Sequence, residues 1–343
     1  MRCGCSIIPD DVLRRLAEDP TLSDETRRSL VDTASLDAQI RDLRAANTLV
    51  TRVAGMSLLG AVELALAPNV WVYDCRNSTS LPGHFVQNPG GSADATAKRT
   101  FDETTAVVEF FRSLFGRNSV DDAGMNLVSS IHYGNGYKNA QWNGAQMIYG
   151  DGDGRIFLDF TRSPDVIGHE ITHGVTQHTA SFNYADEPGG LNESMSDVFG
   201  SMFRQWRLGQ DVTSADWLIG AGIMGPAATE RGFTCLRDMA DPGAAHCLSR
   251  QPSHYSDYQP GMDPHYSSGI GNFAFYTAAM AMGGKSWERA GRTWYRALAA
   301  YGVSPNLQMR EFADRTRESA AALFPGDQQA IDAVDGGWTA VGL

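Results

Sequence analysis

Two histidines four residues apart, with a glutamate directly after the first, form the segment HEITH at residues 169–173. On a helix this spacing places His169 and His173 on one face, so both imidazoles can bind one metal ion. Glu170 then lies beside the ion, where it can take a proton from a water that the metal activates. An ordinary solvated helix face is the alternative. Buried polar groups need a partner such as a cation, and the flanking residues are apolar: Val166, Ile167, Ile171 and Val175.

A catalytic zinc takes three protein ligands and keeps one position open, so a third ligand is needed. His178 falls one residue short of the third histidine in the metzincin pattern, and we expect it to be a packing or surface residue. Glu193, in GGLNESMSD, is the better candidate, with Gly189 and Gly190 making the turn before its helix. Asp197 lies four residues later on the same face, where it can accept a hydrogen bond from a ligating histidine. A capped helix with an exposed acidic face is the alternative here.

The residue patterns also predict the elements that must position these groups. Residues 1–50 are charged and helix-favouring, with Pro and Ser as punctuation, which predicts two short helices. Residues 70–160 alternate Val-, Ile-, Tyr- and Phe-rich runs with Gly, Asn and Asp turns, which predicts strands, together with one helix over 102–117. From Asp165 onward the patterns are mostly helical. We therefore predict an α+β fold, in which a mixed α/β domain is followed by a mainly helical domain.

Several segments together resemble the thermolysin-like zinc metallopeptidases, also called neutral metalloproteinases. HEITH and Glu193 are separated by 19 residues, and YKNAQWNGAQMIYGDGDG, DWLIG, CLRDMADP and HYSSGI occur in the family's order over nearly the whole chain. CSIIP near the start, followed by helices, is similar to the short propeptide of the protealysin-like branch. The resemblance implies a two-domain zincin whose active-site helix lies at the cleft between the domains. It divides the chain into a propeptide over 1–50, an α/β peptidase domain over 51–180 and an α-helical peptidase domain over 181–343.

The same resemblance assigns roles around one catalytic zinc ion. It implies that His169, His173 and Glu193 bind the zinc, and that Glu170 is the general base and later the proton donor to the leaving amine. Two residues are implied to stabilise the tetrahedral oxyanion: Tyr184 and His265. Two further residues are implied to hold the ligating histidines: Asp197 for His169 and Asn192 for His173.

The resemblance also implies how a peptide is held. Asn139 and Ala140 bind the substrate backbone, and Arg237 binds the carbonyl next to the scissile bond. The pocket for the residue after that bond is lined by five apolar side chains: Phe157, Phe160, Val166, Ile219 and Leu236. We therefore expect cleavage on the amino side of Leu, Phe or Ile. Plain core packing is the alternative for each of the five.

The sequence departs from the family pattern near two sites. Gln141 stands where the family usually has an aromatic residue, and Pro260 stands where an aspartate normally orients the catalytic histidine, although Asp263 precedes His265 by two residues. Asp165 and Asp216 remain where calcium-binding carboxylates occur. The other expected carboxylates are replaced, and calcium needs six to eight oxygen ligands, so we predict that the family's double calcium site is absent; the replacements are Arg204, Leu218 and Ala221.

Composition limits the partners. A net charge of −12 without a Lys/Arg block disfavours nucleic acid and anionic membranes. The longest apolar stretch, residues 53–73, contains Glu63 and Pro68 and does not read as a membrane span, and the N-terminus does not read as a signal peptide. Location therefore stays open between the cytoplasm and an unconventional export route. Five cysteines are not a disulfide scaffold, although Cys235 and Cys247 are near enough in sequence to pair.

Three functions follow. The first is a zinc endopeptidase made as a precursor, whose propeptide covers the cleft as an intramolecular inhibitor and whose partners are peptide or protein substrates. A thiolate of Cys3 or Cys5 could then occupy the open zinc position, or these residues only pack. The second is a catalytically weak relative that acts as a binding or toxin-like protein, a reading motivated by the altered segment around His265. The third is an interaction protein with a structural zinc, for which a closing fourth ligand is not evident from spacing.

Overall fold

The structure is a computed structural model that describes residues 5–54 and 67–343, with side chains described outside 43–54. Three elements come first: β1 (Cys5–Ser6), α1 (Asp10–Ala17) and α2 (Asp24–Ala54). Helix α1 follows Pro9 and has two aspartates in its first turn and two arginines in its last, as the helix dipole favours. Two helices were expected here, but α2 is 31 residues long and continues past residue 50. The proposed domain boundary at 50 therefore falls inside a helix.

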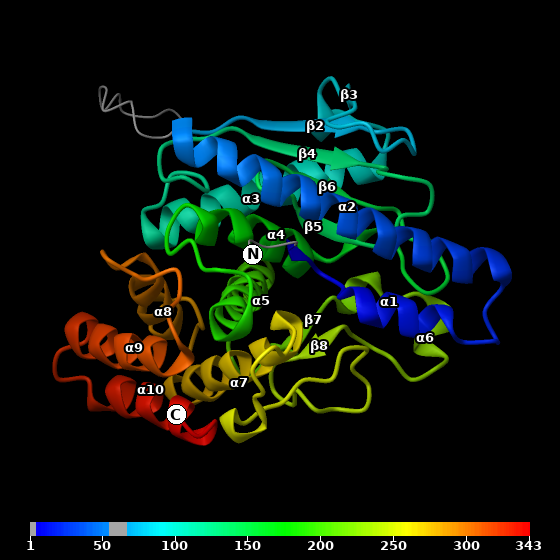
Figure 1. Ribbon diagram of the computed structural model, residues 1–343. Helices are drawn as coiled ribbons and strands as arrows, with labels where there is room; N and C mark the ends of the chain where they lie inside the picture. Colours follow the sequence, from blue (N-terminus) through cyan, green and yellow to red (C-terminus); the bar gives the residue numbers. More distant parts are fainter. Residues whose placement is uncertain (1–4, 55–66) are drawn as a thin grey trace.

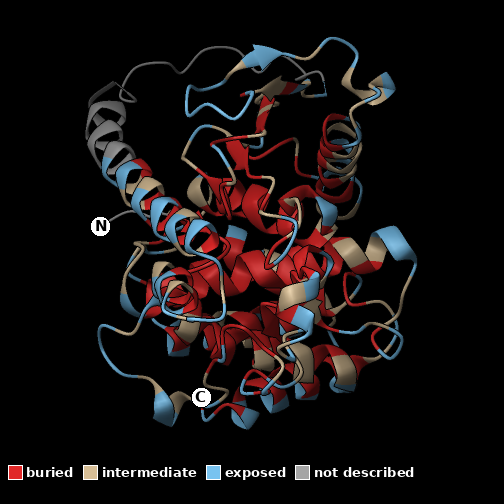
Figure 2. Cartoon of the chain, turned by 90° about the vertical axis from the view of Figure 1, so that its right-hand side faces the viewer, coloured by how far each residue is buried: buried red, intermediate tan, exposed pale blue. Residues whose placement is uncertain are grey.

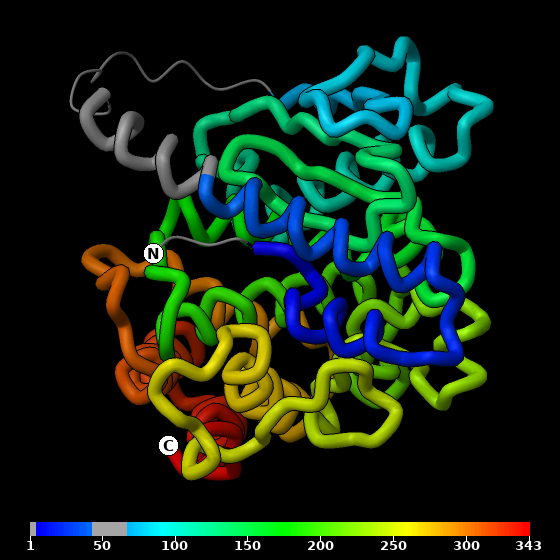
Figure 3. Tube along the Cα trace, turned by 45° about the vertical axis from the view of Figure 1, so that its right-hand side comes forward, coloured from blue at the N-terminus to red at the C-terminus, as the bar shows by residue number. Residues whose placement is uncertain are grey.

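A mixed six-stranded sheet follows, in the order β1-β5-β6-β4-β2-β3. The strands are β2 (Val70–Asp74), β3 (His84–Phe85), β4 (Leu127–Ile131), β5 (Ala140–Trp142) and β6 (Met147–Tyr149). Strands β2, β4 and β6 are parallel to one another, whereas β1 pairs antiparallel with β5 at the edge. The N-terminal segment thus completes the sheet. Figure 1 shows the sheet above the helical half of the molecule, and Figure 3 shows the blue N-terminal segment crossing between the two.

Helices α3 (Ala95–Phe115) and α4 (Pro164–Gln177) pack beneath the sheet. The Asp94 side chain caps α3 by accepting from the backbone N–H groups of Thr96 and Ala97, and Gly116 ends it in the left-handed conformation. Every residue of α4 from Asp165 to Thr176 is buried. Polar groups on α4 therefore have to find partners inside the protein.

The remaining elements form the helical half. They are α5 (Asp186–Leu208), α6 (Pro226–Thr229), α7 (Pro264–Met282), α8 (Ala290–Ala299), α9 (Met309–Leu323), α10 (Gln328–Ala340) and a small ribbon of β7 (Leu218–Ile219) and β8 (Arg237–Asp238). Helix α5 contacts both α4 and α7, and α10 closes the bundle on α7. Buried residues concentrate along these central helices, and exposed ones lie on the outer faces (Figure 2). The predicted α+β architecture with a helical second half is confirmed.

Within the described residues, no helix has both the length and the apolar character that a bilayer crossing requires. Residues 53–73, the apolar stretch considered as a membrane span, lie partly outside the described residues. Cys235 and Cys247 are both free thiols, with their sulfur atoms 3.7 Å apart on neighbouring backbone segments.

The turn expected at Gly189–Gly190 is wrong, because both glycines lie inside the first turns of α5. Their role is close packing. A Cβ atom on Gly189 would lie 2.7 Å from Pro264 Cγ, so these positions let α7 approach α5. Gly200 does the same toward α4, since its added Cβ would lie 2.5 Å from the carbonyl oxygen of Asp165 and 3.1 Å from His169 N.

Gly200→Ala is expected to lower the free energy of unfolding by about 1–3 kcal/mol, because the new methyl group forces α4 and α5 apart in a packed interior. Thermal and urea unfolding would measure the change. Gly336→Ala is the matched control, since it lies in α10 with no atom within 4 Å of an added Cβ. That variant should be neutral or more stable by about 0.5–1 kcal/mol. Equal effects at both positions would contradict the close α4–α5 contact.

Candidate active site

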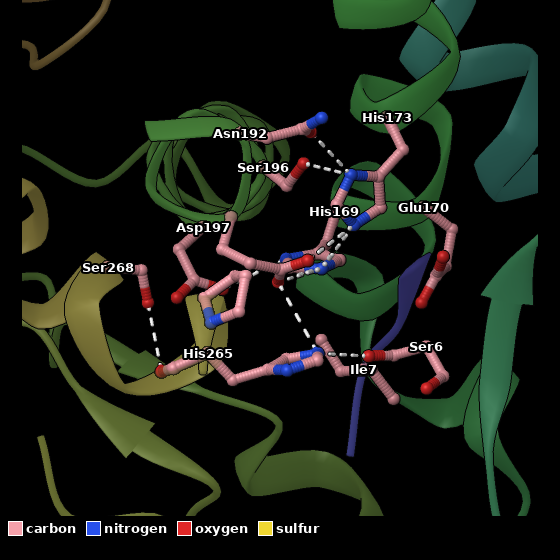
Figure 4. Close-up of polar contacts among 12 residues, drawn as sticks. Ser6, Ile7, His169, Glu170, His173, Asn192, Ser196, Asp197, His265 and Ser268 are labelled. Carbon is pink, nitrogen blue, oxygen red and sulfur yellow. Dashed lines mark hydrogen bonds and ion pairs between the residues drawn. The ribbon is translucent and has the colours of Figure 1, made fainter. Parts of the chain in front are cut away.

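The three expected metal ligands converge between α4 and α5. His169 and His173, one turn apart on α4, face each other with their Nε2 atoms 3.0 Å apart. Glu193 on α5 places Oε2 3.4 Å from His169 Nε2 and Oε1 3.4 Å from His173 Nε2. All three side chains are at most 1% exposed. Figure 4 shows both histidines pointing from α4 toward α5.

The other ring nitrogens of the two histidines have fixed partners. His169 Nδ1 lies 2.9 Å from Asp197 Oδ1, and His173 Nδ1 lies 2.9 Å from Asn192 Oδ1 (Figure 4). Ser196 Oγ, which the sequence reasoning missed, is 3.0 Å from the same nitrogen of His173. A carboxylate only accepts hydrogen bonds, so His169 carries its proton on Nδ1. Both Nε2 atoms are then directed at the point where Glu193 arrives.

This donor set fits zinc. Two ring nitrogens 3.0 Å apart with a carboxylate beside them require positive charge at their centre. Tetrahedral zinc with bonds of about 2.0–2.1 Å separates its ligand atoms by roughly 3.4 Å, close to the observed spacings. Glu193 Oε2 is buried and has no hydrogen-bond partner among the described residues. A cation would satisfy it, so His169, His173 and Glu193 are the residues that would hold the ion.

Glu170 lies next to this centre but contributes no atom to it. Its Oε2 accepts a hydrogen bond from the backbone N–H of Trp142 at 2.7 Å, whereas its buried Oε1 has no partner among the described residues. Burial raises the pKa of Glu170 to about 8. A divalent cation nearby would lower that pKa, because positive charge favours the carboxylate. Oε2 of Glu170 is thus held in place, and Oε1 is available to accept or release a proton.

Asp197 binds several parts of the site together. Besides His169, it accepts hydrogen bonds from Arg237 Nε at 2.8 Å, Arg237 Nη2 at 2.7 Å and Asn272 Nδ2 at 2.8 Å. Burial acts to raise the pKa of Asp197, but the charges and hydrogen bonds of Arg237 and His169 together outweigh it and hold the pKa far below its usual range. Asn272 was not predicted, because it lies on α7, 75 residues away.

His265 and Tyr184 approach the centre from the helical side. Tyr184 Oη lies 3.2 Å from His265 Nε2 and donates a hydrogen bond to Glu193. Asp263, at the N-cap of α7, places Oδ1 2.7 Å from His265 Nδ1. Burial would lower the pKa of His265, but the charges of Glu193 and Asp263 outweigh it and raise the pKa to about 9. Asp263 thus contacts the ring of His265, where the resemblance placed an aspartate at the position of Pro260.

Residues of the N-terminal segment occupy the groups expected to bind a substrate backbone. Asn139 accepts from the Ile8 N–H at 3.0 Å and donates to the Ile8 carbonyl at 2.9 Å. Arg237 Nη1 donates to the Ile7 carbonyl at 2.9 Å, and the Ile7 N–H donates to the Ala140 carbonyl at 3.0 Å. The structure therefore brings Asn139, Ala140 and Arg237 together around one extended peptide.

The five expected pocket residues are all buried and belong to the same apolar cluster as Ile7. The rings of Phe157 and Phe160 are neighbours, with centroids 5.7 Å apart. Val166 comes from α4 and Ile219 from β7, so the cluster draws on both halves of the peptidase. Their assignment to a specificity pocket remains a prediction.

Gln141 and Arg204, which depart from the family pattern, both form side-chain hydrogen bonds. Gln141 Nε2 donates to Asp37 of α2 at 3.2 Å, so this position contacts the N-terminal segment. Arg204 Nη1 donates to Asp216 at 2.9 Å and to the Leu218 carbonyl at 3.1 Å, which places a guanidinium group among the remaining carboxylates. Absence of the calcium site stays a prediction.

Cys5 and Cys3 were the two cysteines considered for the open zinc position. The sulfur of Cys5 lies in a group with His173 and Glu193 in which one ligand atom of each is within 4.8 Å of the others, but Cys5 is disulfide-bonded and offers no thiolate in this state. Cys3 lies outside the described residues. His178, which was not expected to bind metal, is the C-cap of α4, and burial lowers its pKa.

Comparison with known proteins gives consistent matches over the chain. Residues 63–177 match the family described as "Thermolysin metallopeptidase, catalytic domain", and residues 180–343 match "Thermolysin metallopeptidase, alpha-helical domain". An "Extracellular metalloprotease" of Pectobacterium carotovorum subsp. carotovorum is 41% identical over 79% of this chain and 80% of its own length. A thermolysin of Bacillus sp. (strain EA1) is 34% identical over 80% of this chain and 51% of its own.

A solved structure matches almost end to end. The precursor of protealysin, a metalloproteinase from Serratia proteamaculans, superimposes with a TM-score of 0.83 at 35% identity. The match covers 98% of this chain and 99% of that one. It therefore extends over the N-terminal segment as well as both halves of the peptidase.

Asp197→Asn is expected to weaken zinc binding by about 10–100-fold, because the amide loses the charge that fixes the ring of His169. Competition with a chromophoric chelator would measure the dissociation constant, and circular dichroism would check the fold. Asp216→Asn serves as the control, since that carboxylate is half-exposed and pairs with Arg204 outside the centre. Unchanged zinc affinity in Asp197→Asn would contradict this role.

Proposed function

The chain belongs to the thermolysin family of metallopeptidases and is a metalloendopeptidase, and we propose that it is made as a latent zinc-dependent precursor that cleaves peptides before bulky apolar residues. One observation carries the proposal. The Nε2 atoms of His169 and His173 and the carboxylate of Glu193 converge within 3.4 Å, and beside them lies Glu170, whose Oε1 has no partner among the described residues.

The reaction we propose is hydrolysis of a peptide bond by water. Zinc held by His169, His173 and Glu193 would supply Lewis-acid chemistry, polarising the scissile carbonyl and acidifying the attacking water. Glu170 takes the proton of that water and then delivers it to the nitrogen of the leaving amine. The Trp142 N–H holds one oxygen of Glu170 in place, so the other remains available for this transfer.

The charge that develops on the carbonyl oxygen meets two donors. His265 Nε2 and Tyr184 Oη lie side by side, 3.2 Å apart, and face the site from α7 and from the segment before α5. Asp263 holds Nδ1 of His265, which keeps Nε2 directed inward. A preorganised donor of this kind is typically worth about 10²–10³ in kcat.

Substrate recognition follows from the backbone contacts. Asn139 and Arg237 offer donors and an acceptor at spacings that suit an extended peptide, so affinity comes from the main chain of the substrate. Selectivity comes from the buried apolar cluster around Phe157, Val166 and Leu236. We expect Leu, Phe or Ile after the scissile bond.

Latency comes from the N-terminal segment, which acts as an intramolecular inhibitor. Polar contacts hold it on both halves of the peptidase. Arg15 Nη2 donates to the Leu248 carbonyl at 3.0 Å, and Arg231 Nε donates to Asp19 at 3.1 Å. On the sheet side, the buried carboxylate of Asp37 accepts from Tyr137, Asn139 and Gln141.

The binding or toxin-like alternative rested on the altered segment around His265. The 2.7 Å contact between Asp263 and His265 supports catalysis instead, because it restores the carboxylate–imidazole pair that orients the ring. The structural-zinc alternative needs a closed fourth position, and the free oxygen of Glu170 beside the centre favours an open one.

Glu170→Gln should lower kcat/KM on peptides by at least about 10³-fold, because the amide cannot accept the proton of the attacking water, while zinc stays bound. A quenched peptide library with mass spectrometry of the products would measure rate and cleavage position after an added protease has removed the N-terminal segment. Glu109→Gln, an exposed position on α3, is the control. Cuts before Leu, Phe or Ile are expected from the wild type.

Two results would contradict these expectations. If the wild type binds zinc but cuts no peptide even after the segment is removed, the binding-protein alternative replaces the enzyme. If it cuts before small or charged residues, the pocket assignment fails while the peptidase stands.

Docking of the N-terminal segment should weaken as pH rises. Burial raises the pKa of Asp37 to about 7, although hydrogen bonds from Tyr137 and Asn139 act in the opposite direction. The docked state therefore prefers the protonated carboxyl. Docking is fully favoured below about pH 4 and weakens by up to about tenfold per pH unit until about pH 7.

Hydrogen exchange of the α2 amides in the Glu170→Gln precursor, corrected for intrinsic rates, would follow this change, with α10 amides as the internal reference. Asp37→Asn cannot ionise, so its α2 protection should be nearly flat from pH 4 to pH 7. The same slope in both proteins would assign the dependence to another group.

A further inference from the structure

We infer that the N-terminal segment is bound in substrate register, so that Ser6–Ile7 is the scissile bond and the zinc-loaded precursor hydrolyses this bond in its own chain. The inference rests on the proposed peptidase function. It goes beyond latency, because an inhibitor segment need not place any of its peptide bonds at the reacting position.

The direction of the segment is set by the sheet. Strand β1 runs antiparallel to β5, with Cys5 opposite Trp142 and Ser6 opposite Gln141. The next residue continues the ladder, since the Ile7 N–H donates to the Ala140 carbonyl at 3.0 Å. An extended strand added to a sheet edge is recognised through its main chain, so a substrate in the same orientation would make the same contacts.

Three consecutive carbonyls then fix the register. The Ser6 carbonyl oxygen is 2.7 Å from His265 Nε2 (Figure 4). The Ile7 carbonyl accepts from Arg237, and the Ile8 carbonyl accepts from Asn139. The carbonyl beside the proposed oxyanion donor is therefore that of Ser6, and a shift by one residue would break all of these contacts.

The side chain that follows this bond also matches the proposed specificity. Ile7 is fully buried in the main hydrophobic core and is a bulky apolar side chain, the class expected after the scissile bond. Ser6, on the other side of the bond, lies opposite Gln141 and is small. The pair reads as a cut on the amino side of isoleucine.

The chemical step needs only water. The water oxygen bonds to the Ser6 carbonyl carbon, and the bond from that carbon to Ile7 N breaks. Glu170 transfers one water proton to the leaving nitrogen and the second water proton follows, which leaves a carboxylate on Ser6 and an ammonium group on Ile7. The backbone N–H of Trp142, the neighbour of Gln141 on β5, already orients Glu170 beside this strand.

One consequence concerns processing near residue 50. The cleft binds one extended strand, so a molecule holding residues 5–8 cannot also bind its own chain near residue 50. The Ser6–Ile7 bond is therefore cut within one molecule. Cleavage near residue 50 requires a second molecule. The contacts of α1 and α2 are unaffected by the first cut, so the segment stays docked after it.

A spectroscopic test needs no turnover. Serine labelled with ¹³C at the carbonyl and isoleucine labelled with ¹⁵N give two amide peaks, because Ser–Ile occurs twice in the chain, at 6–7 and at 130–131. Adding zinc to the Glu170→Gln precursor should shift the Ser6 carbonyl resonance, since that oxygen lies beside the centre. The Ser130 resonance, on β4, is the internal control and should stay fixed. An unmoved Ser6 resonance in the zinc-loaded protein would overturn the inference.

The kinetic test uses intact-mass spectrometry. The full chain is purified with a chelator, and zinc is then restored. We expect first-order loss of residues 1–6, at a rate independent of protein concentration, giving a chain that begins at Ile7. Ile7→Leu should keep the rate within about tenfold. Ile7→Asp should slow it at least about 100-fold, because the charge is disfavoured in the apolar pocket.

Two outcomes separate this inference from the proposed function. If Ser6–Ile7 stays intact while the same preparation, freed of its N-terminal segment, cleaves a peptide before leucine, the register is wrong and the peptidase stands. If the freed preparation cleaves neither, the proposed function fails and the inference fails with it. Loss of residues 1–6 at a rate proportional to protein concentration would also overturn it, since cleavage would then occur between molecules.

Discussion

The buried carboxylate of Asp197 is the interaction on which the site depends. It accepts hydrogen bonds from His169 on α4, Arg237 on β8 and Asn272 on α7, while it belongs to α5 itself. One anion thereby orients both His169, a proposed zinc ligand, and Arg237, which is proposed to bind the substrate. A buried charge is tolerable only when such donors surround it, so the close approach of α4 and α5 and the position of β8 are mutually required.

The second constraint is that the cleft and the N-terminal segment share one set of polar groups. Asn139, Arg237 and the edge of β5 must be satisfied when they are buried, and residues 5–8 satisfy them with main-chain atoms. A free substrate has to replace these bonds with equivalent ones. In the proposed function, latency and substrate recognition are therefore two uses of the same hydrogen-bonding surface.

Two of the departures from the family pattern form hydrogen bonds within the chain. Gln141 replaces an expected aromatic residue and gives a donor to Asp37, which lies on α2 itself and is buried where that helix packs on the peptidase. Arg204 replaces a carboxylate and neutralises Asp216 from within the chain. In both cases the replacing side chain donates a hydrogen bond to a nearby carboxylate, Gln141 to Asp37 and Arg204 to Asp216.

The residues proposed to bind the metal could be predicted because helical periodicity places them in pairs on single helix faces. The spacing in HEITH puts two imidazoles on one face of α4, and the spacing from Glu193 to Asp197 puts two carboxylates on one face of α5. The alternation of strand and helix patterns likewise predicted the α+β architecture. The prediction that failed concerned a local feature, because Gly189 and Gly190 allow close helix packing and do not form a turn.

The sequence by itself determined which residue types could bind a metal and transfer a proton, because those relations extend over one helical turn. Only the tertiary structure decided which distant groups complete them. Asp263 takes the orienting position beside His265, Asn272 and Arg237 meet at Asp197, and the Ser6 carbonyl reaches His265 across 259 residues of chain. Contacts of that separation depend on how the sheet, α5 and α7 pack, and no local pattern of residues specifies that packing.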